Sequence, residues 1–129
     1  MNQLYQKIQD LAEKRIDFLQ NNPWEWYSGE TTYFEALVEE LAEVKEEIKH
    51  DNTILLEDEL WDIFWCQMCL LQALKKEWKI RSVEKVLERS YEKFSQRIGI
   101  DWRWGKLPWD EIKKVQQQVL QQRHNKLYK

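Results

Sequence analysis

The chain has 129 residues, of which only three are glycine and two are proline, whereas eight are tryptophan. A β-sandwich or barrel needs many turns, and a glycine-rich phosphate loop needs glycines, so this composition excludes both and favours long helices with short loops. The formal charge of −3, from 20 Lys and Arg against 23 Asp and Glu, argues against a general nucleic-acid-binding protein. The length fits one domain that spans residues 1–129.

Two helices are predicted in the first half of the chain. The first ends at Asn21-Asn22-Pro23, and its apolar residues recur at helical spacing: Leu4, Ile8, Leu11, Phe18 and Leu19. A loop from Trp24 to Gly29 follows, after which Thr31 or Thr32 is expected to cap a second helix that runs to about Lys49. The apolar face expected for this second helix consists of Phe34, Leu37, Leu41, Val44 and Ile48.

A third helix is expected from about Thr53 to Glu77, after a break at Asp51-Asn52. Its stretch from Leu60 to Leu74 is so apolar that we expect a buried central helix. At 1.5 Å per residue this stretch reaches about 22 Å, which is too short to cross a bilayer, so we expect no membrane partner. Cys66 and Cys69 lie within it and are expected to pack there without forming a bridge.

Ser82 is expected to cap a fourth helix that runs to Ile98 and ends at Gly99, and Pro108 opens a fifth, glutamine-rich helix. The predicted fold class is therefore all-α, a bundle of four to five helices. Either self-association completes the core around the apolar third helix, or the other helices surround it in a compact monomer, and periodicity leaves both open. The polar start of the chain lacks a secretory signal pattern, so we expect a cytoplasmic protein.

Several acids lack a neighbour of opposite charge on their own helix. Side chains three and four positions apart on a helix touch, and for Glu43 all four such neighbours are acids: Glu39, Glu40, Glu46 and Glu47. Glu40, Glu59 and Asp62 also have no Lys or Arg at these positions, and all three lie beside apolar residues. We expect Glu39, Glu46 and Glu47 to form a solvated face. An aspartate inside an apolar stretch favours a functional role for Asp62.

The two carboxylate pairs on the second and third helices are expected to converge on a divalent cation, because a buried carboxylate is costly without a compensating charge. Oxygen ligands select Mg²⁺, for which Mn²⁺ can substitute. A di-iron centre would need two E-x-x-H motifs, and the chain has only Glu47-Ile48-Lys49-His50. A zinc site would need a set of Cys and His ligands, which the sequence lacks. Nucleophilic catalysis by a cysteine would need a histidine beside it, and nothing in the sequence indicates such a pair.

The words Glu40-Leu41-Ala42-Glu43 and Glu59-Leu60-Trp61-Asp62 are separated by fifteen residues. This E-x-x-E…E-x-x-D pattern resembles the signature of the MazG-like all-α nucleoside triphosphate pyrophosphatases. The resemblance implies a four-helix core assembled as a homodimer, Mg²⁺ held by Glu40, Glu43, Glu59 and Asp62, and hydrolysis of an NTP or dNTP to the monophosphate and pyrophosphate. Trp61 departs from the family, which commonly has a small residue there.

The fourth helix carries cations at successive i+4 steps: Arg81, Lys85, Arg89, Lys93 and Arg97. The first three have an acid three residues further on, whereas Lys93 and Arg97 do not, so we expect these two to be unpaired and suited to phosphates. In the resembled family a Lys and an Arg on this helix contact the substrate, and Lys93-Phe94-Ser95-Gln96-Arg97 is similar to that K-x-x-x-R arrangement.

The expected mechanism is metal-assisted attack of water at the α-phosphorus, with Glu40 or Glu43 accepting the proton and Lys93 and Arg97 steadying the β and γ charges. Trp24 and Trp26 are candidates for stacking on the base, as are Trp102, Trp104 and Trp109. For any single one of these rings, a place in the core or at an interface is the simpler interpretation. Two alternatives stay open: a non-catalytic helical module that binds nucleotide or metal, and a phosphoribosyl-ATP pyrophosphatase.

Overall fold

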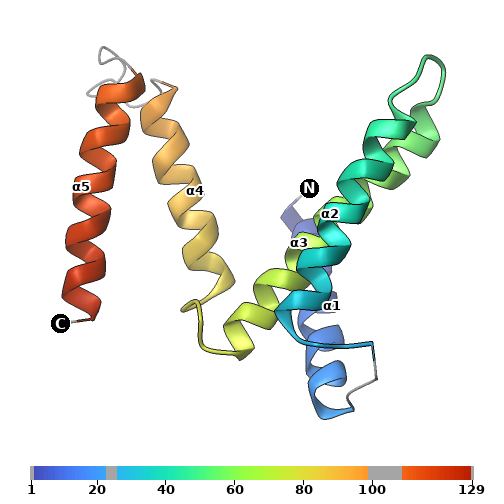
Figure 1. The fold of residues 1–129 in the computed structure, drawn as a ribbon, viewed down its shortest axis with the longest axis horizontal. Helices are drawn as coiled ribbons and strands as arrows, with labels where there is room; N and C mark the ends of the chain where they lie inside the picture. Colours follow the sequence, from blue (N-terminus) through green and yellow to red (C-terminus); the bar gives the residue numbers. More distant parts are fainter. Residues whose placement is uncertain (1, 23–25, 99–108, 129) are drawn as a thin grey trace. The chain divides into compact units, whose positions relative to one another are not determined.

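The structure is a computed structural model that describes residues 2–22, 26–98 and 109–128. All regular structure in these residues is helical, which confirms the all-α class (Figure 1). The five helices are α1 (Asn2–Asn21), α2 (Glu30–Glu47), α3 (Thr53–Lys76), α4 (Val83–Arg97) and α5 (Trp109–Leu127). Within the described ranges, none of them combines the length and the apolar character that a membrane crossing requires.

The chain forms two compact units, residues 1–83 and 84–129. In the first unit α3 packs against both α1 and α2 (Figure 1). The Tyr5 hydroxyl donates to the Met68 sulfur at 3.9 Å, and Asp17, one turn from the end of α1, pairs with Lys76 at the end of α3. The helices α1 and α3 therefore run in the same direction.

The helix α2 runs antiparallel to α3, since an ion pair between Glu30 and Lys79 joins the start of α2 to the residues that follow α3. Its N-cap is Gly29, which has a φ of 70° and supplies no side-chain cap. The expected cap by Thr31 or Thr32 is therefore wrong: the Thr32 hydroxyl instead accepts the Ser28 backbone N–H at 2.7 Å. Glycine suits this position because other residues rarely adopt a positive φ.

The turn between α2 and α3 lies where the sequence predicts a break. Asp51 has a φ of 55°, and the Asn52 side-chain amide donates to the Glu47 backbone carbonyl at 2.8 Å and to its carboxylate at 2.6 Å. Asn52 thus satisfies a carbonyl at the end of α2 and leads directly into α3. The second helix ends at Glu47, two residues earlier than expected.

The core of the first unit is contributed mainly by α1 and by the second half of α3. Its buried apolar residues are Ala12, Ile16, Leu19, Tyr33, Val44, Cys66, Met68, Cys69, Leu71, Ala73 and Val83, and two glutamines, Gln9 and Gln72, are buried with them. The stretch of α3 from Leu60 to Leu74 is expected from the sequence to be buried. This expectation is wrong at the start of the stretch, because Leu60 and Trp61 are each 49% exposed. Only the side of α3 that α1 and α2 cover is removed from solvent in the described chain.

Two apolar stripes face away from this core. On α1, Leu4, Leu11 and Phe18 recur every seven residues and are exposed. On α2, Phe34, Val38 and Leu41 are exposed. The apolar face expected for this helix is therefore wrong at Phe34 and Leu41, and it is also wrong at Ile48, which is exposed and follows the last residue of α2. The apolar residues of α2 divide between two faces of the helix. The face that meets α3 buries Tyr33 and Val44, and the face with Phe34, Val38 and Leu41 is exposed to solvent.

The second unit consists of α5 and all but the first residue of α4. The helix α4 begins at Val83, directly after the expected cap Ser82. Residues Ile112 and Gln116 of α5 are buried. The expected helix breakers Gly99 and Pro108 lie outside the described residues.

Candidate functional site

The acidic site begins with the face that α2 presents to α3. Tyr33, Leu37, Glu40 and Val44 follow one another at helical spacing, and Tyr33 and Val44 are buried. Glu40 occupies a position in this stripe where an apolar residue would otherwise pack, and it is half-buried there. The fold of α2 therefore places a carboxylate at the helix–helix contact.

The four acids of the sequence pattern lie in one continuous cluster. Carboxylate oxygens of Glu40, Glu43 and Glu59 lie within 4.8 Å of one another, and so do those of Asp58, Glu59 and Asp62. Glu59 belongs to both groups and joins α2 to α3. Asp58 is the member that the motif missed, although its position next to Glu59 and four residues before Asp62 was a signal for it.

The electrostatics of the cluster favour the protonated acids. Burial, followed by the nearby carboxylates of Glu43, Asp62 and Glu59, raises the pKa of Glu40 from 4.5 to about 7. Burial first and then the Glu43 carboxylate raise the pKa of Glu59. Burial, Asp58 and Glu43 raise the pKa of Asp62. At all three groups, burial and neighbouring acids make the ionised form of the carboxyl group unfavourable.

Two of the carboxylate oxygens, Oε2 of Glu40 and Oε2 of Glu59, are buried and have no hydrogen-bond partner among the described residues. A buried anionic oxygen without a partner is costly, and a divalent cation would supply both the missing charge and the missing contact. The donor set consists only of carboxylate oxygens, which suits a hard cation such as Mg²⁺ or Mn²⁺. The residues present therefore fit a divalent metal ion.

The other acids of α2 lie outside this cluster. Glu39 and Glu46 are exposed, and Glu47 accepts the hydrogen bond from Asn52. The solvated face expected for these acids is therefore confirmed at Glu39 and Glu46, whereas Glu47 is half-buried. At the E-x-x-H motif, the His50 imidazole pairs with the exposed Asp51 carboxylate at 2.9 Å.

Both cysteines are free and buried, as expected for packing residues. Burial raises the pKa of Cys66, and it raises the pKa of Cys69 to about 12. Because the thiolate is the reactive form, neither side chain is suited to nucleophilic catalysis at neutral pH.

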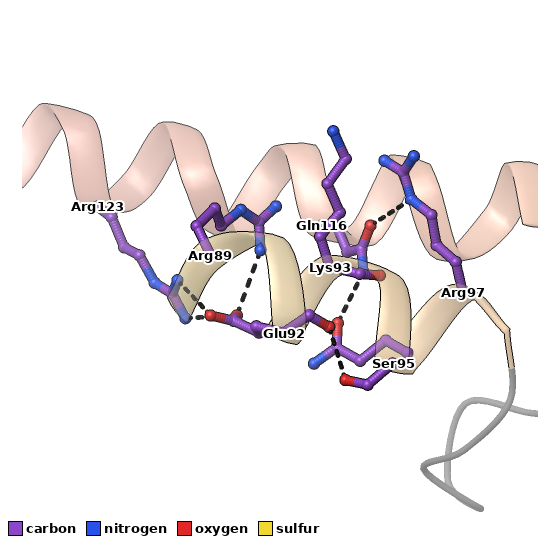
Figure 2. Close-up of polar contacts among 8 residues, drawn as sticks. Arg89, Glu92, Lys93, Ser95, Arg97, Gln116 and Arg123 are labelled. Carbon is purple, nitrogen blue, oxygen red and sulfur yellow. Dashed lines mark hydrogen bonds and ion pairs between the residues drawn. The ribbon is translucent and has the colours of Figure 1, made fainter. Parts of the chain in front are cut away.

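The cations proposed from sequence lie on α4, in the second unit (Figure 2). The Arg97 Nε–H donates to the Gln116 side-chain oxygen of α5 at 2.8 Å, so the expectation that Arg97 is unpaired is wrong. The Lys93 ammonium lies 5.5 Å from the centre of the Phe94 ring, and the Arg97 guanidinium lies 5.7 Å from the same ring. Both cations therefore flank one partly exposed aromatic side chain.

Two other cations of the predicted ridge, Lys85 and Arg89, pair with the acid three residues further on as predicted, whereas Arg81 precedes the first residue of α4. Lys85 contacts Glu88 at 3.2 Å, and Arg89 contacts Glu92 at 3.4 Å. Glu92 also receives two hydrogen bonds from Arg123 of α5, which lower the pKa of Glu92. The pair between Glu92 and Arg123 could not be predicted from neighbours on one helix, because Arg123 lies on α5.

Among the candidate stacking residues, Trp26 is 51% exposed and the Arg15 guanidinium lies 5.7 Å from its ring centre. Trp24, Trp102 and Trp104 lie outside the described residues, and Trp109 begins α5. A further tryptophan outside this candidate set, Trp78, is 92% exposed and has a φ of 63° just after α3.

The MazG nucleotide pyrophosphohydrolase domain, as a sequence family, matches residues 28–99, which is more than half of the chain. The protein therefore belongs to the MazG family, as the motif indicated. The match takes in α2, α3 and α4, and so includes the acidic cluster together with Lys93 and Arg97. No curated protein and no solved structure matches the chain.

Proposed function

We propose that this MazG-family protein is a Mg²⁺-dependent pyrophosphohydrolase that converts an NTP or dNTP to the monophosphate and pyrophosphate. The observation that carries the proposal is the convergence of Glu40 and Glu43 with Glu59, together with the two buried carboxylate oxygens that lack partners in the described chain. We propose that this activity takes place in the cytoplasm. Its proposed role is to remove unwanted nucleotides or to control the dNTP pool.

The ligands proposed for Mg²⁺ are Glu40, Glu43, Glu59 and Asp62, and Asp58 extends the same cluster. A bound divalent ion would polarise the phosphate oxygens and lower the pKa of a coordinated water. Glu40 or Glu43 then accepts a proton from the attacking water. A carboxylate within hydrogen-bond reach of the attacking water is the kind of group that serves as a general base.

The bond that forms joins the water oxygen to the α-phosphorus, and the bond that breaks joins that phosphorus to the bridging oxygen, so pyrophosphate leaves. Lys93 and Arg97 are proposed to bind the β- and γ-phosphates, because cations stabilise the charge that develops on a leaving pyrophosphate. Trp24 and Trp26 are proposed to stack on the base, and half of the Trp26 side chain is open to such a contact.

The proposed active form is a homodimer. The exposed stripes Leu4, Leu11 and Phe18 on α1 and Phe34, Val38 and Leu41 on α2 support it, since a soluble monomer rarely leaves contiguous apolar stripes of this kind uncovered. A second copy of the chain would bury them and complete a core that α1, α2 and α3 leave open. The proposed single domain over residues 1–129 would then include both compact units of each copy.

The test is pyrophosphate release from a panel of NTPs, dNTPs and phosphoribosyl-ATP, with Mg²⁺ and with a chelator. We expect release with Mg²⁺, loss of release with the chelator, and loss in Glu43→Ala and Asp62→Ala. Glu46→Ala is the matched control, because Glu46 is an exposed acid of α2 outside the cluster. Unchanged turnover in both cluster variants would overturn the proposal, and binding without turnover in the wild type would favour the non-catalytic module.

A further inference from the structure

A single glutamine of the Gln116-Gln117-Gln118 run is buried. Gln116 is 3% exposed, whereas its two neighbours are exposed. A primary amide is stable in such a place only if its polar atoms are hydrogen-bonded. The contacts of Gln116 therefore explain why α5 carries an amide at this position.

The Gln116 amide makes three hydrogen bonds, all of them to the last part of α4 (Figure 2). Its Nε2 donates to the Lys93 backbone carbonyl at 2.9 Å and to the Gln96 side-chain oxygen at 2.8 Å. Its Oε1 accepts the Arg97 Nε–H at 2.8 Å. One side chain of α5 thus contacts the backbone of one proposed phosphate-binding residue and the side chain of the other.

These partners leave the amide only one orientation. The Lys93 carbonyl can only accept and the Arg97 Nε–H can only donate, so rotating the amide by 180° would place two acceptors together and two donors together. A fixed amide in turn fixes the Arg97 guanidinium, whose planar arrangement of N–H groups determines where it can meet an anion.

The partner of the Arg97 Nε–H is uncharged. Glu92, one turn earlier on α4, is ionised and pairs with both Arg89 and Arg123. Gln116 instead holds Arg97 in place without adding a negative charge beside the guanidinium.

We propose that Gln116 is a positioning residue that sets the orientation of the Arg97 guanidinium, and of the last turn of α4 around Lys93, for binding phosphate. This inference rests on the proposed function, in which Lys93 and Arg97 bind the β- and γ-phosphates. It also gives the glutamine-rich helix α5 a role in substrate binding that its polar composition alone did not show.

The first experiment compares the full-length wild type with Gln116→Met, which has a similar length and volume but makes none of the three hydrogen bonds. We expect the KM for the best nucleotide to rise about tenfold while kcat changes less than about twofold, the size of one hydrogen bond to a charged group. Gln117→Met makes the same chemical change at an exposed site, and Arg123→Gln removes a different α4–α5 contact. Both controls should keep the wild-type KM.

A double-mutant cycle separates positioning from a general loss of stability. If Gln116 acts through Arg97, Gln116→Met should raise KM less than about twofold in an Arg97→Lys background, since Lys has no Nε–H for the amide to hold. Additive effects of the two substitutions would overturn the inference. Gln116→Glu covers the case in which the Met variant does not fold: it keeps an acceptor for Arg97 but adds a negative charge, and it should also raise KM.

A nucleotide-free measurement distinguishes failure of this inference from failure of the proposed function. The Arg97 Nε–H nuclear magnetic resonance signal, assigned by its loss in Arg97→Lys, should exchange slowly in the wild type and rapidly in Gln116→Met. Inorganic tripolyphosphate with Mg²⁺ should bind the wild type about tenfold more tightly than Gln116→Met. A wild type that hydrolyses nucleotides with a KM equal to that of Gln116→Met overturns the inference alone. If the wild type hydrolyses nothing, the proposed function fails, and equal or absent tripolyphosphate binding then overturns the inference as well.

Discussion

A carboxylate oxygen of Glu40 on α2 lies within 4.8 Å of one from Glu59 on α3. Each of these residues also buries its Oε2 without a hydrogen-bond partner in the part of the chain that the structure describes. Two anions held this close oppose folding of the metal-free protein and favour binding of a cation. This contact therefore lowers the stability of the metal-free protein and favours the binding of a divalent cation. The predictions on pH, on added metal and on Glu40→Gln follow from it.

The stability of the metal-free protein should fall as the pH rises from about 4.5 to about 7. The pKa of Glu40 is about 7 in the folded protein and 4.5 in the reference state, so between these values the folded protein binds more protons than the unfolded chain. Stability then decreases with rising pH across that interval and levels off above it. Thermal unfolding followed by circular dichroism in chelator at pH 5, 6, 7 and 8 measures this, and an unfolding temperature that rises across the interval contradicts it.

The carboxylates that are paired with cations act in another pH range and do not obscure this effect. Arg123 lowers the pKa of Glu92, and Lys79 lowers the pKa of Glu30. Their stabilisation is present above the ordinary pKa of 4.5 and is lost only as the pH falls through the lowered values. The variant Glu40→Gln should show less of the decrease between pH 4.5 and 7 and the same loss at lower pH.

Mg²⁺ or Mn²⁺ should raise the unfolding temperature more at pH 8 than at pH 5. A protonated carboxyl group binds a divalent cation poorly, so protons and metal compete at Glu40 and its neighbours. Thermal shift at fixed ionic strength measures the difference, with Na⁺ as the ionic control. Equal shifts at the two pH values would show that the ions bind elsewhere.

Glu40→Gln should stabilise the metal-free protein at pH 8 while it removes activity. The amide takes away one of several mutually repelling charges, so the unfolding temperature should rise by a few degrees, whereas kcat/KM should fall about hundredfold or more. Glu39→Gln makes the same change on an exposed residue of α2 and serves as the control. A Glu40→Gln variant that keeps full turnover would remove Glu40 from the site.

Nucleotide binding should quench tryptophan fluorescence less in Trp26→Ala than in the wild type if this ring stacks on the base. The Trp26 ring is half exposed and lies against Arg15, so it can accept a flat ligand on its open side. Titration with a nucleotide in Ca²⁺ instead of Mg²⁺ slows turnover during the measurement. Equal quenching in the wild type, Trp24→Ala and Trp26→Ala would exclude this pair from the base site.

Val38→Lys should convert the proposed dimer to a monomer. Val38 lies between Phe34 and Leu41 on the exposed apolar stripe of α2, and a buried lysine at an interface costs more than the interface gains there. Sedimentation velocity over a range of concentrations measures the change. Glu35→Lys on the same helix is the control, and a wild type that sediments as a monomer at all concentrations contradicts the dimer.

The sequence predicted the helices and the acidic cluster well because both depend on local spacing. The pairs Glu40 with Glu43 and Glu59 with Asp62 each lie on one helix face, and two antiparallel helices then have to bring the pairs together. It predicted less well wherever a second element decides the outcome. The neighbour rule gave Arg97 no partner because Gln116 lies nineteen residues away on another helix, and the apolar residues of α2 divide between two faces that periodicity alone did not separate.

The Asp51 turn gives the spacing of the four acids a geometric meaning. Glu43 and Glu59 are each eight residues from Asp51, and Glu40 and Asp62 are each eleven residues from it. In an antiparallel helical hairpin, residues equally distant from the turn lie at the same height, so the motif is a mirror image about this residue. The fifteen residues between Glu43 and Glu59 are therefore set by the length of the hairpin and its turn, and not by the chemistry of the acidic cluster. A lengthened turn that keeps the Asn52 contact to Glu47 should preserve the alignment of the acids. Deleting one residue between either pair and the turn should instead rotate that pair about 100° away from the other.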